Sequence, residues 1–291
     1  MATPAQWLEG ARPRTLPTAI APVLAGTAIA IATGGARWGL AALCLVVALG
    51  LVIGVNFAND YSDGIRGSDG EDRVGPLRLV GSGVAEPSHV KAAAFGCFGV
   101  SAVAGLVITI ITGHWWFLIL GLACILAAWF YTGGSHPYGY AGLGEVFVFV
   151  FFGLVAVGGT IYVQTDHVGA AGWVTASLIG FLACAVLVAN NLRDIDGDRI
   201  SGKRTLATKL GPQGTRVCYL ALVFLACVGV VVVAALTTWW ALLGLLMIAL
   251  LVSPVKAMVT RTTGMALVPV LKNTGLAELV GSIGLFVAAL I

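Results

Sequence analysis

The feature that most constrains this chain is the recurrence of apolar runs of about 18 or more residues along its length. A helix of that length can cross the hydrocarbon core of a bilayer. Only 10% of the residues are charged, against about 25% in soluble domains. We therefore predict an all-α polytopic membrane protein in which nine transmembrane helices form a bundle around a central cavity. The predicted spans are residues 15–35, 39–59, 90–111, 115–133, 143–163, 172–192, 216–237, 239–258 and 274–291.

A weak internal repeat indicates how these spans are arranged within a single domain, residues 1–291. An Asn-x-x-x-Asp pattern ends the second span at Asn56 and recurs at the end of the sixth span at Asn190. Because the two patterns are four spans apart, their helices point the same way. We expect two parallel four-helix halves, about residues 15–133 and 143–258, plus a ninth helix. Residues 264–271 are too few to cross and are expected to lie at the interface or to re-enter.

The basic residues predict which loops face the cytoplasm. Every Lys and Arg except Arg37 falls on one side of the predicted spans, and cytoplasmic loops carry such an excess. The N-terminus is therefore predicted inside and the C-terminus outside. We expect a multi-pass protein of the cell membrane whose active site faces the cytoplasm. Tryptophans typical of an interfacial belt fall at the predicted outer ends, at Trp38, Trp115, Trp116, Trp173, Trp239 and Trp240.

An acidic stretch, residues 56–72, follows the second span on the predicted cytoplasmic face. With 3.6 residues per turn, Asn56, Asp60 and Asp63 fall within about 60° of one another, so one helix face presents all three. Carboxylates at the end of a membrane helix are costly unless they are paired or bound to a metal. These three residues are therefore candidates for ligand binding.

A second acidic stretch, residues 190–207, follows the sixth span. Asp194 and Asp198 are one turn apart if the helix runs that far, although Gly197 argues against a regular helix there. The alternative for both stretches is a solvated loop whose charges only fix the topology. That alternative is as good as a ligand role for Asp69, Glu71, Asp72, Asp196 and Arg199.

Several carboxylates on one membrane face repel each other unless a divalent cation lies among them. Mg²⁺ prefers oxygen ligands, takes one or two carboxylates and fills its other positions with waters and substrate phosphates. The basic side chains interleaved with the acids suit phosphate oxygens; they are Arg78, Arg193 and Lys203. We expect the two stretches to face each other and to hold a magnesium-bound diphosphate.

A third loop, residues 131–145, contains no Lys or Arg, and its Gly and Pro content predicts a turn. Tyr131, Tyr138 and Tyr140 are candidates to line the mouth of the cavity and to stabilise a cation with their π faces. Anchoring at the membrane interface is an equally good role for each of them. His136 is a candidate base, although a lone loop histidine is usually neither base nor ligand.

Five segments resemble the intramembrane aromatic prenyltransferases of the UbiA superfamily. They are RPRTLPTAIAPVLAGTA (11–27), NFANDYSDGIRGSD (56–69), RVGPLRLVGSG (73–83), YTGGSHPYGYAGLGEVFVFVFFG (131–153) and NNLRDIDGDRISGKRTLA (190–207). The resemblance covers essentially the whole chain and implies a nine-helix bundle that binds Mg²⁺ and a prenyl diphosphate. The segments are most similar to the branch that prenylates 1,4-dihydroxy-2-naphthoate in menaquinone synthesis. The close spacing of Asp63 after Asn59 and Asp60 favours this branch over the ubiquinone type.

The resemblance also implies roles for individual residues and partners. A long polyprenyl group would pass from polyprenyl diphosphate to the aromatic acceptor, in the lipid bilayer, with loss of diphosphate and CO₂. Magnesium would be the cofactor, with Mn²⁺ as a substitute, and no nucleic acid is implied. The implied metal ligands are Asn56, Asp60, Asp63, Asp194 and Asp198. The implied catalytic residues are Asp60, Asp63, Asp194, Asp198 and Lys203. The implied substrate-binding residues are Asn56, Asn59, Arg78, Tyr131, Tyr138, Asn190, Arg193 and Lys203.

Two alternatives stay open at the level of the sequence. A sibling prenyltransferase would use 4-hydroxybenzoate, haem, a chlorophyll precursor or phosphoribosyl diphosphate. A secondary transporter is the alternative of another class, but its binding site would lie near the bilayer midplane, whereas the acids here lie at helix ends. Glu145 falls at a predicted helix start, where its charge favours the helix dipole, and Glu278 receives no predicted role.

Overall fold

The computed structural model describes residues 2–67, 77–134, 137–200 and 202–291. Every regular element in these ranges is a helix, so the all-α prediction is confirmed for the described residues. The chain divides into two compact units, Met1–Leu16 with Leu43–Ala141 and Pro17–Ala42 with Gly142–Ile291. Each unit is described by itself.

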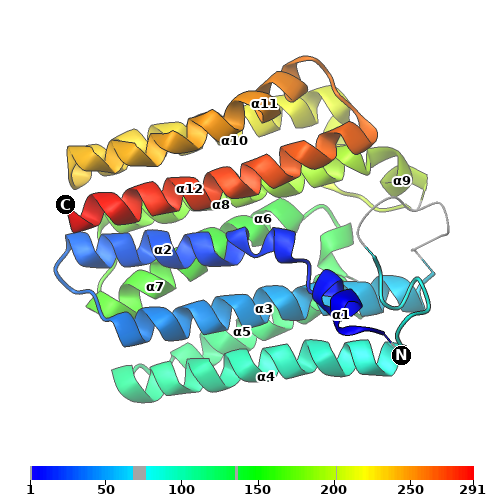
Figure 1. Cartoon of the computed structure of the whole chain (residues 1–291), viewed down its shortest axis with the longest axis horizontal. Helices are drawn as coiled ribbons and strands as arrows, with labels where there is room; N and C mark the ends of the chain where they lie inside the picture. Colours follow the sequence, from blue (N-terminus) through cyan, green and yellow to red (C-terminus); the bar gives the residue numbers. More distant parts are fainter. Residues whose placement is uncertain (1, 68–76, 135–136, 201) are drawn as a thin grey trace. The chain divides into compact units, whose positions relative to one another are not determined.

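The first unit is built around the apolar helices α3, α4 and α5 (Figure 1). Phe57 of α3 packs with Val90, Ala94 and Phe98 of α4 in a buried apolar cluster. α4 stops at Gly113, whose φ of 73° is a conformation that glycine adopts without steric cost. The elements in chain order are α1 (Pro4–Gly10), the 3₁₀ turn η1 (Pro13–Thr15), α3 (Trp38–Ile65, whose first residues belong to the second unit), α4 (Pro87–Thr112), α5 (Phe117–Phe130) and the 3₁₀ turn η2 (Tyr138–Tyr140).

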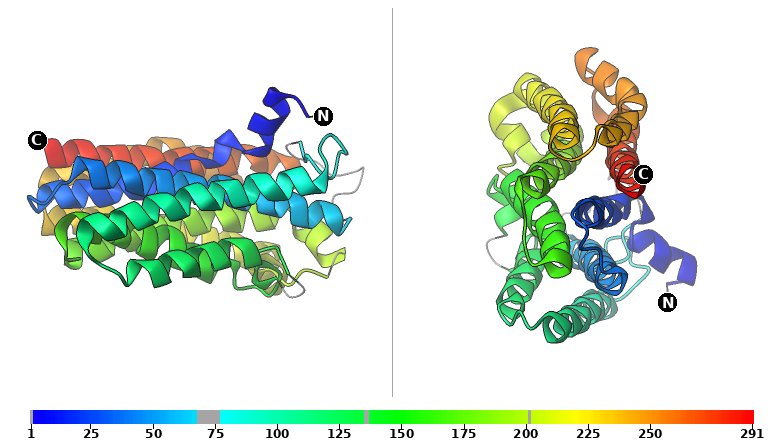
Figure 2. Two further views of the ribbon diagram at one scale, coloured as in Figure 1. Left: turned by 90° about the horizontal axis from the view of Figure 1, so that it is seen from below. Right: turned by 90° about the vertical axis from the view of Figure 1, so that its left-hand side faces the viewer.

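The second unit has α8 at its centre. α8 packs against α10 and α12, and α2 packs against α12 and α7 (Figure 1 and Figure 2). Ile179 and Leu182 of α8 and Tyr219 of α10 are fully buried in this core. The elements are α2 (Pro17–Ala32), α6 (Gly144–Val148), the π-helical η3 (Phe149–Val155), α7 (Ala156–Thr165), α8 (Ala170–Arg193), α9 (Ile195–Ile200), α10 (Leu206–Leu236), the 3₁₀ segment η4 (Trp239–Met247), α11 (Ile248–Val259), the 3₁₀ turn η5 (Gly264–Leu267) and α12 (Val268–Leu290).

Among the described residues, seven helical segments are long and apolar enough to cross a membrane. An eighth is obtained if the bent pair Pro4–Thr15 and Pro17–Ala32 forms one span. Each of the nine predicted spans overlaps a helix, but α5 has only 14 residues, fewer than the roughly 20 that usually cross a bilayer. Nine crossings, the two parallel halves and the sidedness of the termini therefore stay predictions.

Residues 264–271 are not a separate short segment, which corrects one part of the sequence expectation; their position at the interface or in a re-entrant loop stays a prediction. They form η5 and the beginning of α12, and Gly264–Leu290 as a whole is long and apolar enough to cross. A proline in the first turn of a helix interrupts no hydrogen bond. Pro269 therefore does not end the span.

Gly284 marks a close approach of α12 to the backbone of η4. A Cβ atom at Gly284 would clash with the carbonyl group of Leu243, whereas a Cβ atom at Gly275 would meet nothing within 4 Å. Both glycines lie in α12, so alanine brings each the same gain in helix propensity. The two positions differ in packing alone.

We expect Gly284→Ala to lower the melting temperature of the purified protein and Gly275→Ala not to lower it. Overpacking costs about 1–3 kcal/mol, which corresponds to roughly 2–10 °C for a chain of this size. The measurement is thermal unfolding in detergent, followed with a probe that does not react with the free cysteines. Equal melting temperatures for the two variants would contradict the close packing of α12 on η4.

Candidate functional site

The first acidic motif lies at the end of α3, which continues to Ile65. Asn56, Asp60 and Asp63 are buried, with relative exposures of 6%, 1% and 8%. The Asn56 amide group donates to the carbonyl oxygen of Ala11 at 3.0 Å and to the Thr15 hydroxyl at 2.9 Å. These bonds tie the N-terminal segment to the helix end. The prediction that the three polar residues belong to one helix is confirmed.

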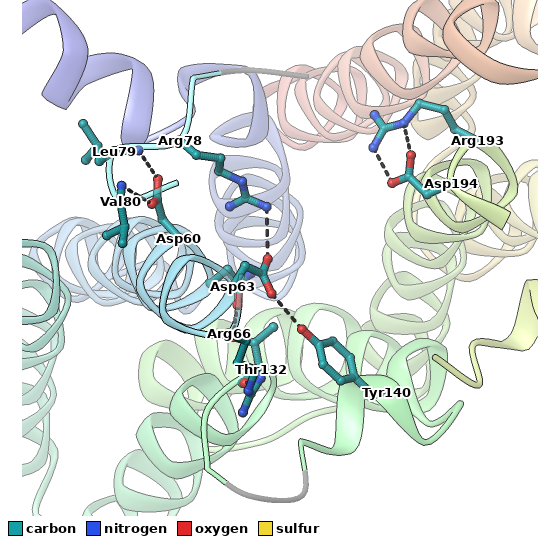
Figure 3. Close-up of polar contacts among 11 residues, drawn as sticks. Asp60, Asp63, Arg66, Arg78, Leu79, Val80, Thr132, Tyr140, Arg193 and Asp194 are labelled. Atoms are coloured by element: carbon teal, nitrogen blue, oxygen red, sulfur yellow. Dashed lines mark hydrogen bonds and ion pairs between the residues drawn. The ribbon is translucent and has the colours of Figure 1, made fainter. Parts of the chain in front are cut away.

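Asp60 organises the backbone of the segment that precedes α4. Its two carboxylate oxygens accept the N–H groups of Leu79 at 2.8 Å and Val80 at 3.0 Å (Figure 3). Arg12 lies close enough to interact with Asp60 electrostatically. The backbone of Arg12 has a φ of 56°, a conformation that is uncommon outside glycine. Asp60 therefore has a structural function in addition to any role toward a ligand.

Asp63 has one basic and one aromatic partner, Arg78 and Tyr140, from distant parts of the sequence (Figure 3). Its Oδ2 forms an ion pair with Arg78 Nη2 at 3.2 Å, and the Tyr140 hydroxyl donates to its Oδ1 at 2.7 Å. Burial raises the pKa of Tyr140, and the charge of Asp63 raises it further, so this hydroxyl stays protonated and donates. The guanidinium group of Arg66 lies 5.7 Å from the centre of the Tyr140 ring.

Hydrogen bonds join the loop that contains Tyr131, Tyr138 and Tyr140 to the end of α3. Arg66 donates to the carbonyl oxygens of Thr132 and Gly134, and the Thr132 hydroxyl donates to Asn59 Oδ1 at 2.7 Å. The Tyr138 hydroxyl donates to a carbonyl oxygen of α5, and its ring packs edge-on against Tyr131 at 5.5 Å. Within the first unit, the loop is thus part of the surroundings of the first acidic motif.

The second acidic motif continues α8 almost without a break. α8 ends at Arg193, Asp194 is a single turn residue, and α9 then carries Gly197 within a helix. The N–H group of Asp194 donates to the carbonyl of Asn190, and the N–H group of Asp198 donates to the carbonyl of Asp194 at 2.9 Å. Gly197, which argued against a regular helix, lies within α9, and these bonds carry the helical path past Asp194.

Arg193 and Asp194 form a two-bond ion pair, with Nε–Oδ1 at 2.7 Å and Nη2–Oδ2 at 2.6 Å (Figure 3). The Asp194 side chain is 39% exposed, so this carboxylate remains accessible. Asp196 is 90% exposed at its side chain and lies 3.6 Å from Arg199. For Asp196 and Arg199 the structure thus favours the solvated-loop alternative.

Asp198 is the partly buried carboxyl group of the second motif. Burial raises its pKa to about 6, while the positive charge of Lys203 acts in the opposite direction. The backbone N–H of Lys203 also donates to the carbonyl of Asp198 at 2.9 Å, which closes the turn between them. A cation beside Asp198 would favour the ionised carboxylate.

The donor set fits a magnesium ion in chemistry. The motifs supply carboxylate and amide oxygens, which are the ligands that Mg²⁺ accepts. Among the described residues, no group of three or more His, Cys, Asp or Glu is gathered closely enough to hold a metal ion. Mg²⁺ commonly takes only one or two carboxylates and completes its shell with waters and phosphate oxygens. Asp69, Glu71, Asp72 and His136 lie outside the described residues.

Comparison with known families decides the identity. Residues 19–266 match the sequence profile of the UbiA prenyltransferase family. The chain belongs to this family.

UbiA-family relatives with an assigned activity are similar over nearly the whole chain. The 1,4-dihydroxy-2-naphthoate octaprenyltransferase of Mycobacterium tuberculosis is 52% identical over 96% of this chain and 95% of that protein. The protein of the same name from Escherichia coli is 39% identical over 92% of this chain and 89% of that protein. The protein is therefore a multi-pass membrane prenyltransferase.

The fold is similar to that of a solved UbiA homologue from Archaeoglobus fulgidus. That structure, bound to GPP and Mg²⁺, aligns with a TM-score of 0.72 over 98% of this chain and all of the other chain. The identity is 14%, so this likeness concerns the fold. It agrees with the all-helical architecture described above.

Several residues beside the motifs were not predicted as part of a UbiA site. In the first unit these are Arg12 and Arg66; Tyr140 was a candidate for the cavity mouth, but its hydrogen bond to Asp63 was not predicted. In the second unit Asn191, one turn before Asp194, donates to Glu145 Oε1 at 2.9 Å. The position of Arg66 three residues after Asp63 was a usable helical signal. The Tyr140 and Glu145 contacts join residues far apart in sequence.

We expect Asp60→Asn to accelerate hydrogen–deuterium exchange in residues 77–84. Asparagine offers one acceptor oxygen in place of two, so one buried N–H group loses its partner. That loss costs about 1–3 kcal/mol, which corresponds to roughly 10–100-fold faster exchange. Asp166→Asn is the control, because Asp166 is an exposed, left-handed residue at the end of α7 that asparagine also suits. Unchanged exchange in Asp60→Asn would contradict the structural role of Asp60.

Proposed function

We propose that this protein transfers a polyprenyl group from polyprenyl diphosphate to 1,4-dihydroxy-2-naphthoate, with loss of diphosphate and CO₂. The product is demethylmenaquinol, which oxidises readily to demethylmenaquinone, so the reaction belongs to menaquinone biosynthesis. The observation that carries the proposal is the 52% identity with the mycobacterial enzyme across almost the full length of both chains.

The two acidic motifs are the proposed site for Mg²⁺ and the diphosphate. When bound, Mg²⁺ supplies a Lewis acid that stabilises the charge developing on the diphosphate oxygens. Supporting observations are the oxygen donor sets at the ends of α3 and α8 and the solved homologue that holds Mg²⁺ with GPP. The proposed metal ligands are Asn56, Asp60, Asp63, Asp194 and Asp198.

Basic residues of the motifs are proposed to bind the diphosphate directly. Arg78 and Arg193 are each oriented by a motif carboxylate, Asp63 and Asp194 respectively. Arginine presents a planar fork of donors that suits phosphate oxygens, and Lys203 adds a mobile positive charge. Their positive charges lower the energy of the leaving diphosphate as the allylic C–O bond breaks.

The polar and aromatic residues near the first motif have proposed roles toward the two substrates. The hydroxyl of Tyr138 is bound to a backbone carbonyl, so its ring is the part proposed to face the allylic cation, together with the ring of Tyr131. Asn59 and Asn190 are proposed to position the substrates beside the metal ligands. Apolar side chains of the helices are proposed to exclude water from the cation.

The proposed location of the active site is the cytoplasmic face of the cell membrane. Support comes from the Lys and Arg distribution, in which Arg37 is the single basic residue on the predicted outer side. A polyprenyl chain is as apolar as lipid, so it can enter from the bilayer while its diphosphate stays at the polar surface.

The test is an assay of the purified full-length protein in detergent or nanodiscs. We expect 1,4-dihydroxy-2-naphthoate, octaprenyl diphosphate and Mg²⁺ to give a prenylated, decarboxylated naphthoquinone, detected in the lipid phase by mass spectrometry. Mn²⁺ is expected to replace Mg²⁺, and excess EDTA to abolish the product. Product with 4-hydroxybenzoate but not with 1,4-dihydroxy-2-naphthoate would contradict the proposed acceptor. Full activity in EDTA, or no metal-dependent product with any aromatic acceptor, would overturn the reaction.

A further inference from the structure

Glu145 lies at the start of α6, beside the second acidic motif but outside it. Its carboxylate accepts a hydrogen bond from the Asn191 amide at 2.9 Å, and its backbone carbonyl accepts one from the Cys184 thiol at 3.1 Å. Cys184 and Asn191 are seven residues apart, so they share one face of α8. That face meets α6, and the two bonds hold the Glu145 carboxylate in a defined place.

The position of Glu145 relative to the second motif suits a role toward the acceptor. Asn191 precedes Asp194 by three residues, which is about 4.5 Å along a helix axis and about 60° around it. The carboxylate is therefore about one turn farther into the helical bundle than the Arg193–Asp194 pair. The attacking ring must come within about 3.5 Å of the allylic carbon bonded to the diphosphate. Substituents of that ring are within reach of a group one turn away.

The surroundings of Glu145 allow it to act as a proton acceptor. A carboxylate has about four acceptor positions, so the bond from Asn191 leaves capacity for another. Lys209 of α10 interacts with the carboxylate electrostatically, and the thiols of Cys184 and Cys218 are the neighbouring titratable groups from α8 and α10. Glu278 of α12 lies beyond Cys184. Glu145 itself is partly exposed, so a ligand can reach it.

We propose that Glu145 is a catalytic base that takes the proton of an acceptor hydroxyl group. This proposal rests on the prenyl transfer proposed above. The hydroxyl concerned is the one next to the ring carbon that carries the carboxylate group. Removal of its proton makes that carbon a better nucleophile toward the allylic carbon.

Atoms and electrons balance over the whole step. The O–H bond breaks and its proton passes to Glu145, while the ring forms a C–C bond to the allylic carbon. The C–O bond of the prenyl diphosphate breaks, and its electron pair leaves with the diphosphate. The bond to the carboxylate group then breaks, CO₂ departs, and its electron pair restores the aromatic ring. The ring oxygen recovers its proton from Glu145, so the base is regenerated.

Glu145→Gln separates proton transfer from structure, because the glutamine oxygen still accepts the bond from Asn191. At pH 7 we expect kcat to fall by about 10²–10⁴-fold, with KM for octaprenyl diphosphate unchanged within about threefold. The deficit should shrink as the pH rises, because the acceptor hydroxyl then ionises in solution. Glu86→Gln, which removes an exposed carboxylate before α4, is the matched control and should behave as the wild type.

Two results would overturn the role of Glu145. One is a Glu145→Gln kcat within threefold of the wild type at pH 7; the other is a deficit that is constant with pH. If Glu145→Gln fails to fold, Glu145→Asp is measured. Because aspartate is still a carboxylate, this variant should show the wild-type dependence of kcat on pH, with lower kcat at every pH. A deficit in kcat that shrinks as the pH rises would mean that the aspartate does not act as a base, and would contradict the proposal. If the wild-type protein makes no product from 1,4-dihydroxy-2-naphthoate, the proposed function is wrong. The wild-type assay shows this before any variant is compared.

Discussion

The structure depends on how the charges of carboxylates at the ends of apolar helices are paired. A carboxylate that leaves water without a partner is costly. At the end of α3 the balance comes from backbone N–H groups for Asp60 and from Arg78 and Tyr140 for Asp63. At the end of α8 it comes from Arg193, which holds Asp194 with two hydrogen bonds. Each motif is thus stable as a polar structure in its own right.

The partners that stabilise the acids are also the groups that a diphosphate requires. Arg78 and Arg193 neutralise Asp63 and Asp194, and arginine is well suited to phosphate oxygens. A magnesium diphosphate brings both signs of charge, so it can pair with the carboxylates through the metal and with the arginines through its oxygens. Few additional groups are then needed to bind it. Asn191, which donates to Glu145, lies one turn before Asp194, so Glu145 is held beside the second motif.

The sequence predicted what depends on local periodicity and composition. Asn56, Asp60 and Asp63 were placed on one helix because their spacing matches 3.6 residues per turn, and α3 does extend through them. Local reasoning failed at Gly197, where propensity argued against a helix but the bond from Asp198 to Asp194 continues it. It also treated residues 264–271 as a segment of their own, whereas they form η5 and the first turn of α12.

Contacts between distant segments were beyond sequence reasoning. Tyr140 reaches Asp63 across 77 positions, and Asn191 reaches Glu145 across 46. No spacing rule for a single helix or strand relates such residues, and they become neighbours only when packed helices bring their loops together. The structural use of Asp60 was missed for the same reason, since Leu79 and Val80 lie 19 and 20 positions away. A carboxylate that looks like a metal ligand in sequence can therefore also be a structural anchor.

The central proposal is that each acidic motif contributes to the binding of a prenyl diphosphate with Mg²⁺. Its most direct test is equilibrium binding of a non-reactive prenyl thiolodiphosphate to purified protein with and without Mg²⁺. The account predicts that Asp63→Asn and Asp194→Asn each weaken the Mg²⁺-dependent binding by tenfold or more, while the exposed Asp166→Asn leaves it unchanged. Wild-type affinity in either variant would contradict a role of that motif in binding.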